Sequence, residues 1–153
     1  METMRFIITA HPAPETKPAD PDAPLDETMF TAYMRFNEEM FKAGVLVAAE
    51  GLNPAGRGAQ VAAKGGKRVV TDGPFAETKE LVGGFYILEV NSLAEAIDWA
   101  LRCPTGLGFD DMLDIRPLTG IADLPPEIGT LIRQTAPEWT AALWSDQRNR
   151  GTK

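Results

Sequence analysis

The alternation of apolar and polar residues divides this chain into short strands and helices. Short apolar runs at residues 5–10, 45–50, 84–90 and 112–118 predict four β-strands, and in the first of them Phe6, Ile8 and Ala10 fall on one face. Strand 84–90 carries large apolar side chains on both of its faces. Such a strand is typical of the middle of a sheet, so we expect it at a central position.

Two helices are predicted between these strands. Asp26 is placed to cap a helix that runs to about Ala43, and Ser92 and Glu95 form the S-x-x-E capping box of a second helix. Apolar residues at helical spacing mark the face that each helix turns toward the sheet. These residues are Met29, Tyr33, Phe36 and Met40 of the first helix, widened by Phe30, Met34 and Phe41, and Leu93, Ala96, Ile97, Ala100 and Leu101 of the second.

Three further segments lie outside this core pattern. Residues 11–24 contain five prolines and predict an exposed, irregular loop. Residues 60–63 and 67–71 predict a positively charged hairpin, which either protects the sheet edge from aggregation or attracts a phosphate group. Residues 127–133 and 138–147 predict two short amphipathic helices near the C-terminus.

The order of these elements predicts an α+β chain with a ferredoxin-like fold. The order is β-α-β, a hairpin, and β-α-β again, in which two helices cover one face of a single antiparallel sheet. The other face needs a second covering layer, so the sequence predicts a homodimer. We expect a domain over residues 4–118 and a C-terminal helical extension over residues 119–153. The apolar residues expected on the uncovered face include Phe6, Ile8, Val47 and Ile87.

Charge and composition exclude several classes of protein. The formal net charge is −7, the isoelectric point is about 4.7, and the 15 basic residues form no stripe, which excludes direct binding of nucleic acid. No apolar run approaches the roughly 20 residues of a membrane span, and the N-terminus lacks the pattern of a signal peptide. We therefore expect a cytoplasmic protein without membrane contact.

The single cysteine and the absence of familiar motifs narrow the chemistry further. Cys103 has no second cysteine for an internal disulfide or for a metal-binding spacing, so we expect it to be structural. The sequence contains no nucleotide-binding glycine motif, metalloprotease motif or nucleophile elbow. We expect no cofactor and no bound metal.

Residues 71–80, "TDGPFAETKE", resemble the signature of the DGPF family, whose members are related to the YCII-like proteins. The segments "NEEMFKAGVLVAAEGLNP" and "GGFYILEVNSLAEAIDWALRCP" resemble the same family, so the resemblance covers about residues 4–118. It implies two sheets that close into a dimeric α/β barrel, a fold that hosts chemistry without cofactors. The biochemical role of the family is largely unassigned. Its members often accompany or are fused to extracytoplasmic-function sigma factors, which makes a sigma factor a candidate partner.

The residues with chemical potential gather at strand ends. Asp72 opens a tight glycine-proline turn, Phe75 and Lys79 follow in the loop that leads to the central strand, and Glu50 closes the second strand. Carboxylates and a lysine beside an apolar cleft predict a general acid/base site, with Asp72 and Glu50 as catalytic residues and Phe75 and Lys79 as ligand-binding residues. Each has a structural alternative. Asp72 can cap its turn, Lys79 can lie on a solvated loop, and Glu50 can form a salt bridge to Lys79 or Arg57.

His11 and Tyr33 complete the candidate ligand-binding residues. His11 is the only histidine, and its proline-rich loop predicts either a ligand contact or an exposed histidine without a function. In YCII-like relatives a histidine of the first helix is thought to pair with an aspartate, and the matching position here is Tyr33. A phenol with a pKa near 10 is a poor base and a fair hydrogen-bond donor at neutral pH, so a histidine-dependent mechanism does not carry over. Tyr33 either orients a ligand against Asp72 or belongs to the core.

Two functions remain open from the sequence. The first is a small-molecule-binding protein, or a cofactor-independent enzyme, that uses acid/base carboxylates in a cleft where Gly83 and Gly84 leave room for a ligand. The second is a regulatory or interaction protein associated with an extracytoplasmic-function sigma factor. The sequence does not identify the small molecule.

Overall fold

A four-stranded antiparallel sheet forms the centre of the molecule. The computed structural model describes residues 2–13, 22–53, 58–72, 82–105 and 111–144. The sheet has the order β2-β5-β1-β6, so the central position expected for residues 84–90 is confirmed. Its strands are β1 (Met4–Pro12), β2 (Leu46–Gly51), β5 (Gly84–Val90) and β6 (Asp111–Pro117).

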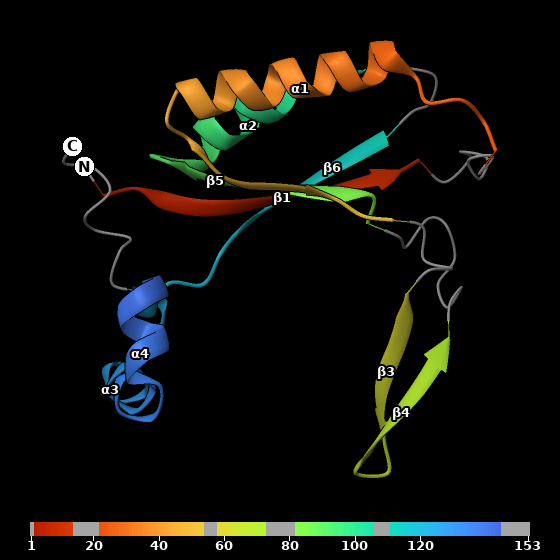
Figure 1. Ribbon diagram of the computed structural model, residues 1–153. Coiled ribbons are helices and arrows are strands. Elements are labelled where there is room, and N and C mark those ends of the chain that lie inside the picture. The colour runs from red at the N-terminus through yellow and green to blue at the C-terminus, as the bar shows by residue number, and fades with distance from the viewer. Residues whose placement is uncertain (1, 14–21, 54–57, 73–81, 106–110, 145–153) are drawn as a thin grey trace.

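Two helices cover one face of this sheet (Figure 1). Helix α1 (Glu27–Lys42) connects β1 to β2, and helix α2 (Leu93–Leu101) connects β5 to β6. The fold class is α+β, and the strand order with its two β-α-β crossings is compatible with a ferredoxin-like fold.

Both helices begin at the residues that the sequence indicates. The Asp26 carboxylate accepts hydrogen bonds from the backbone N–H groups of Thr28 at 2.9 Å and Met29 at 3.2 Å. In α2 the Ser92 hydroxyl accepts from the Glu95 N–H at 3.2 Å. The Glu95 carboxylate in turn accepts from the N–H of Asn91 at 2.8 Å, one residue before the position that a capping box uses.

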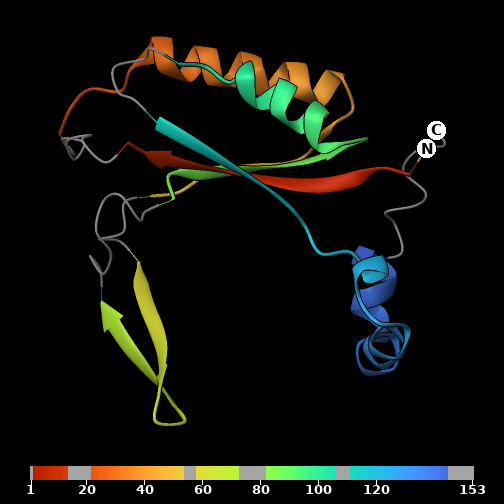
Figure 2. The same cartoon turned by 180° about the vertical axis from the view of Figure 1, so that it is seen from behind.

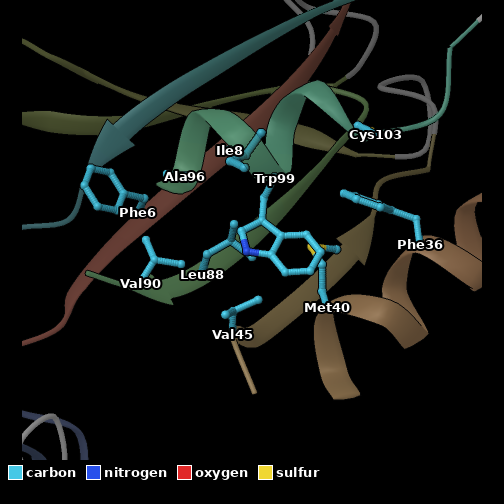
Figure 3. Close-up of a cluster of buried hydrophobic side chains, with 10 residues drawn as sticks. All are labelled: Phe6, Ile8, Phe36, Met40, Val45, Leu88, Val90, Ala96, Trp99 and Cys103. Carbon is cyan, nitrogen blue, oxygen red and sulfur yellow. The ribbon is translucent and has the colours of Figure 1, made fainter. Parts of the chain in front are cut away.

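The hydrophobic core lies between the sheet and the two helices. Figure 3 shows the Trp99 ring of α2 pointing toward Met40 and Phe36 of α1. Phe36 also packs edge-on against the ring of Tyr86, with ring centroids 5.7 Å apart. The buried members of this core are Phe6, Ile8, Phe36, Met40, Val45, Leu88, Val90, Ala96, Trp99 and Cys103.

The helix faces that were expected to meet the sheet are correct only in part. In α1, Phe36 and Met40 are buried and Met29 and Tyr33 are half-buried, but the predicted widening of the stripe is wrong, because Phe30, Met34 and Phe41 are exposed. In α2 the buried residues are Ala96 and Trp99, whereas Leu93, Ile97 and Leu101 are exposed. The large indole fixes the orientation of α2, because burying Trp99 removes more apolar area from water than burying a leucine.

The pairing of residues between strands shows which side chains lie on each face of the sheet. Phe6 pairs with Leu88 and Ile8 pairs with Tyr86, so these side chains share the face that the helices cover. The expectation that Phe6 and Ile8 lie on the uncovered face is therefore wrong. The uncovered face instead carries the alternate residues, which include Ile7, Thr9, Phe85, Ile87, Ala48, Asp114 and Arg116.

A hairpin projects from the body. Strands β3 (Ala59–Lys64) and β4 (Lys67–Asp72) form a separate two-stranded sheet. The turn between them has positive φ at both Gly65 (58°) and Gly66 (78°), which is the requirement of a two-residue type I′ turn and confirms the predicted hairpin. We call residues 58–72 the arm.

The C-terminal extension is helical. It consists of a 3₁₀ turn (Ile121–Asp123), α3 (Pro126–Thr135) and α4 (Pro137–Trp139), which continues as a π-helical turn (Thr140–Trp144). We call residues 119–144 the tail; residues 145–147 of the second predicted helix lie outside the described residues. Figures 1 and 2 show that the arm and the tail both project on the side of the sheet opposite the two helices.

Candidate functional site

Four strand ends meet at one end of the sheet. Strands β1 and β2 end there and strands β5 and β6 begin there, since Gly84 pairs with both Ala10 and Gly51 and Pro12 pairs with Asp111. We call this end, with the side chains around it, the pole. The loops that follow β1 and β2 and those that precede β5 and β6 all start or finish at the pole. Three of the six sequence-predicted site residues, His11, Tyr33 and Glu50, belong to it.

Backbone contacts hold these strand ends close together. The Gly83 N–H donates to the Ala10 carbonyl at 2.8 Å, and the Leu52 N–H donates to the Gly83 carbonyl at 3.0 Å. A Cβ atom on Gly84 would lie 2.8 Å from the Glu50 carbonyl oxygen, closer than real Cβ contacts. Gly84 therefore serves the close approach of β5 to β2, and the expectation that it leaves room for a ligand is wrong.

On the helix-covered side of the pole, two phenols, a thiol and a carboxylate lie together. Tyr33 comes from α1, Tyr86 from β5, Cys103 from the segment after α2, and Asp111 from the first position of β6. The hydroxyl of Tyr86 hydrogen-bonds the thiol of Cys103, and the negative charge of Asp111 acts on all three of the other groups. Cys103 is buried, and Tyr33, Tyr86 and Asp111 are half-buried.

The surroundings keep the thiol and both phenols protonated at neutral pH. Burial, followed by the charge of Asp111, raises the pKa of the Cys103 thiol to about 11, although the hydrogen bond from Tyr86 opposes this rise. Burial is also the first cause of the raised pKa of Tyr86 and of Tyr33, with Cys103 as the next cause for each. The cluster therefore offers neutral hydrogen-bond donors beside an acceptor carboxylate.

His11 lies on the other side of the pole, on the uncovered face of the sheet. It belongs to β1, so the prediction that the irregular loop begins at residue 11 is wrong for His11 and Pro12. The His11 Nε2 atom is 2.8 Å from the Thr9 hydroxyl and 3.4 Å from a carboxylate oxygen of Asp114 in β6, and its side chain is only 16% exposed. His11 is thus held by neighbours, which excludes the expectation of a free, exposed histidine.

Glu50 shares a cross-strand row with this histidine cluster but lies at the far edge of the sheet. Glu50 pairs with Phe85, Phe85 with Thr9, and Thr9 with Asp114. Three strand spacings of about 4.8 Å place Glu50 roughly 14 Å from Asp114. The structure brings Glu50 and His11 to one face and one end of the sheet, but not into direct contact.

The remaining predicted residues are in or beside the segment that runs from the arm to the pole. Asp72 ends strand β4, where its backbone pairs with Ala59. Its side chain, together with Phe75 and Lys79, lies outside the described residues. The chain returns at Val82 and Gly83, directly at the pole.

Sequence reasoning missed three members of the pole. Tyr86 lies within the strand that the sequence predicts as central, Cys103 is expected to be structural, and the sequence pattern gives Asp111 no role. A signal for Asp111 was present, because a carboxylate at the start of the last strand of a ferredoxin-like fold lies beside the end of the first strand. The proximity of Cys103 to Tyr86 depends on the orientation of α2, which the sequence pattern did not give.

A shallow groove also runs along the outer surface of α1. Both carboxylates of its lining are already paired, since Glu38 lies 3.4 Å from Lys42 and Glu39 accepts a hydrogen bond of 2.7 Å from Arg102. We therefore place the candidate site at the pole. The groove is lined by Phe30, Thr31, Met34, Arg35, Glu38 and Glu39.

The described residues contain neither a membrane-spanning helix nor a metal-binding group. No helix among them is long and apolar enough to cross a membrane. Within the same residues, no group of three or more His, Cys, Asp or Glu side chains is arranged to hold a metal ion.

Comparison with known proteins gives a family match and a sequence relative. Residues 4–117 match the family described as the YCII-related domain. An uncharacterized protein of Rhizobium meliloti (strain 1021) is 33% identical over 93 residues, which cover 61% of this chain and 75% of that protein.

Proposed function

The chain belongs to the YCII-related family, and from this premise we propose that it is a homodimeric small-molecule-binding protein whose ligand occupies the pole. The observation that carries this proposal is the cluster of neutral donors, Tyr33, Tyr86 and Cys103, beside the carboxylate of Asp111. Such a cluster suits a small polar molecule that presents an oxygen acceptor to the phenol of Tyr33 and a hydrogen-bond donor to the carboxylate.

We propose a catalytic role separately, for a ligand on the uncovered side of the pole, where His11 and Glu50 lie. In this proposal Asp72 and Glu50 act as general acid and base on that ligand, while His11, Phe75 and Lys79 contact it. Support comes from Glu50, whose backbone pairing with Phe85 puts it on the same face and at the same end of the sheet as His11. The reaction needs no cofactor, because proton transfer between carboxylates and a ligand is complete in itself.

The homodimer closes through the uncovered face of the sheet, so that two sheets form a dimeric α/β barrel. Ile7, Phe85 and Ile87 give this face an apolar centre, and Arg5, Glu89, Asp114 and Arg116 surround it with charge. An apolar centre with a polar rim is the usual anatomy of a protein interface. Burial of the apolar centre favours association by about 25 cal/mol per Å².

The binding proposal is tested by titrating the protein with a panel of small carboxylic acids, ketones and phenols in a calorimeter. We expect at least one of these probes to bind the parent chain, and Tyr33→Phe or Asp111→Asn to weaken that binding about tenfold or more, because each removes a hydrogen bond to a charged or strongly polar group. Asp98→Asn, which removes an exposed carboxylate of α2, is the matched control and should bind as the parent does.

Two outcomes contradict the binding proposal. One is the absence of binding by every probe. The other is binding that responds equally to Asp98→Asn and Asp111→Asn, because the ligand then lies elsewhere or responds only to net charge.

A further inference from the structure

The arm presents apolar side chains to solvent on both of its faces. Val61 pairs directly with Val70 on one face, and Ala62 pairs with Val69 on the other. Val61 is 55% exposed, Val69 43% and Val70 65%. A two-stranded ribbon buries little of its own surface and is marginally stable alone, so an arm with this composition needs a surface to lie against.

The charges at the tip of the arm indicate what kind of surface that is. Three of the four charged residues of the arm, Lys64, Lys67 and Arg68, are basic and lie at or next to its turn, whereas the fourth, Asp72, is at its base. Lys64 and Lys67 stand directly opposite each other across the two strands. Like charges in this position destabilise a hairpin, and within the described residues neither lysine is paired with a carboxylate. An acidic partner surface would remove this repulsion.

The tail carries mostly acidic residues, opposite in charge to the tip of the arm. Its charged residues are Asp123, Glu127 and Glu138, with Arg133 as the single base. Its apolar side chains are also exposed, with Leu131 at 56% and Ile128 at 39%. Helix α3 packs on the other elements of the tail, as Gly129 does against Ile121. The tail is thus an acidic helical unit with an apolar outer surface.

The arm and the tail lie at opposite ends of the sheet, on its uncovered side. The arm projects at the pole and the tail at the other end, and the two views in Figures 1 and 2 agree on this placement. A two-fold axis that joins two uncovered faces and exchanges the sheet ends brings the arm of each copy against the tail of the other. An axis that keeps the ends in place instead brings the two basic arm tips together, which charge repulsion disfavours.

We propose that the arm of each subunit docks on the tail of its partner, with the basic tip near Glu127 and Glu138 and the valines against Ile128 and Leu131. This inference rests on the proposed homodimer and defines its axis. It also places the partner's tail beside the pole, so that each candidate site is bordered by both subunits.

The test is a pair of charge reversals that can be mixed. The arm variant carries Lys64→Glu and Lys67→Glu, and the tail variant carries Glu127→Lys and Glu138→Lys. Each variant alone repels itself at both arm–tail contacts, so its dimer dissociation constant should rise about tenfold by sedimentation equilibrium. In the mixed dimer both contacts become attractive again. Native mass spectrometry of the mixture should therefore show heterodimers well above the half of all dimers that random pairing gives.

A control pair of variants reverses charges on helices α1 and α2, to show that any preferred pairing comes from the arm and the tail. Arg35→Glu with Lys42→Glu, mixed with Glu38→Lys and Asp98→Lys, changes charges of both signs away from the arm and the tail. This mixture should pair at random. Random pairing of the arm and tail variants would overturn the proposal while leaving the homodimer intact. A monomeric parent chain would instead overturn the homodimer, and with it the arm–tail contact.

Discussion

At the scale of single residues, the candidate site depends on groups that are kept neutral. Tyr33, Tyr86 and Cys103 sit where burial and the charge of Asp111 both oppose ionisation, so their pKa values are raised. A site made of such groups can hydrogen-bond a ligand while the groups themselves stay un-ionised. It differs from a histidine-based site, which changes charge near neutral pH.

The raised pKa values predict a loss of stability at alkaline pH. The Cys103 pKa rises from 9.0 to about 11 in the folded chain, so between these values the unfolded chain releases a proton that the folded chain retains. The stability that the Cys103 thiol contributes is therefore fully present below pH 9 and is lost as the pH rises toward 11. Urea unfolding between pH 7 and pH 11 measures this loss. Cys103→Ala should reduce the loss of stability between pH 9 and pH 10, where the unfolded thiol ionises ahead of the phenols; an unchanged curve contradicts the assignment.

The substitution Asp72→Asn distinguishes a ligand-contacting role of Asp72 from a turn-capping role. It keeps the volume and most of the capping ability and removes the charge. If Asp72 acts on a ligand, the variant should keep its folding stability and lose binding or activity. If Asp72 only caps its turn, stability should fall by about 1 kcal/mol and binding per folded molecule should not change. A variant equal to the parent in both measurements means that Asp72 does neither.

At the scale of elements, caps and turns were the features most accurately predicted from sequence. Asp26, Ser92 and the Gly65-Gly66 turn act locally, and local hydrogen bonds and φ angles follow from the residue types. The faces of α2 were less predictable, since Ile97 and Trp99 compete for the core and the tertiary contact with Met40 decides between them. The same dependence on tertiary contacts explains why Tyr86, Cys103 and Asp111 were not recognised as one cluster.

Gly84 and Gly83 provide a matched pair of substitutions at the pole. A Cβ on Gly84 meets the Glu50 carbonyl oxygen at 2.8 Å, whereas a Cβ on Gly83 meets the Ala10 carbonyl oxygen at an ordinary 3.7 Å. Gly84→Ala should therefore destabilise the chain by about 1–3 kcal/mol, because β2 must move away from β5. Gly83→Ala should change stability by less than about 1 kcal/mol. Equal midpoints of urea unfolding for the two variants would show that the strand ends are not held this closely.

At the scale of the whole molecule, the sheet has one face covered by helices and one uncovered face. Helices α1 and α2 bury one face, and the arm and the tail extend past the other without covering it (Figure 1). The sequence predicted this asymmetry through the order of its elements, but it assigned Phe6 and Ile8 to the wrong face. That error arose because both faces of β1 are apolar, so alternation alone does not say which face the helices cover.

The central claim is that the uncovered face joins two copies of this chain, and analytical ultracentrifugation of three proteins at micromolar concentration tests it most directly. The parent and the control Ile97→Arg, which places the charge on the exposed surface of α2, should sediment at twice the chain mass of 16.6 kDa. Ile87→Arg, which places the same charge at the centre of the uncovered face, should sediment as a folded monomer. A monomeric parent, or an Ile87→Arg variant that remains as dimeric as Ile97→Arg, would contradict the claim.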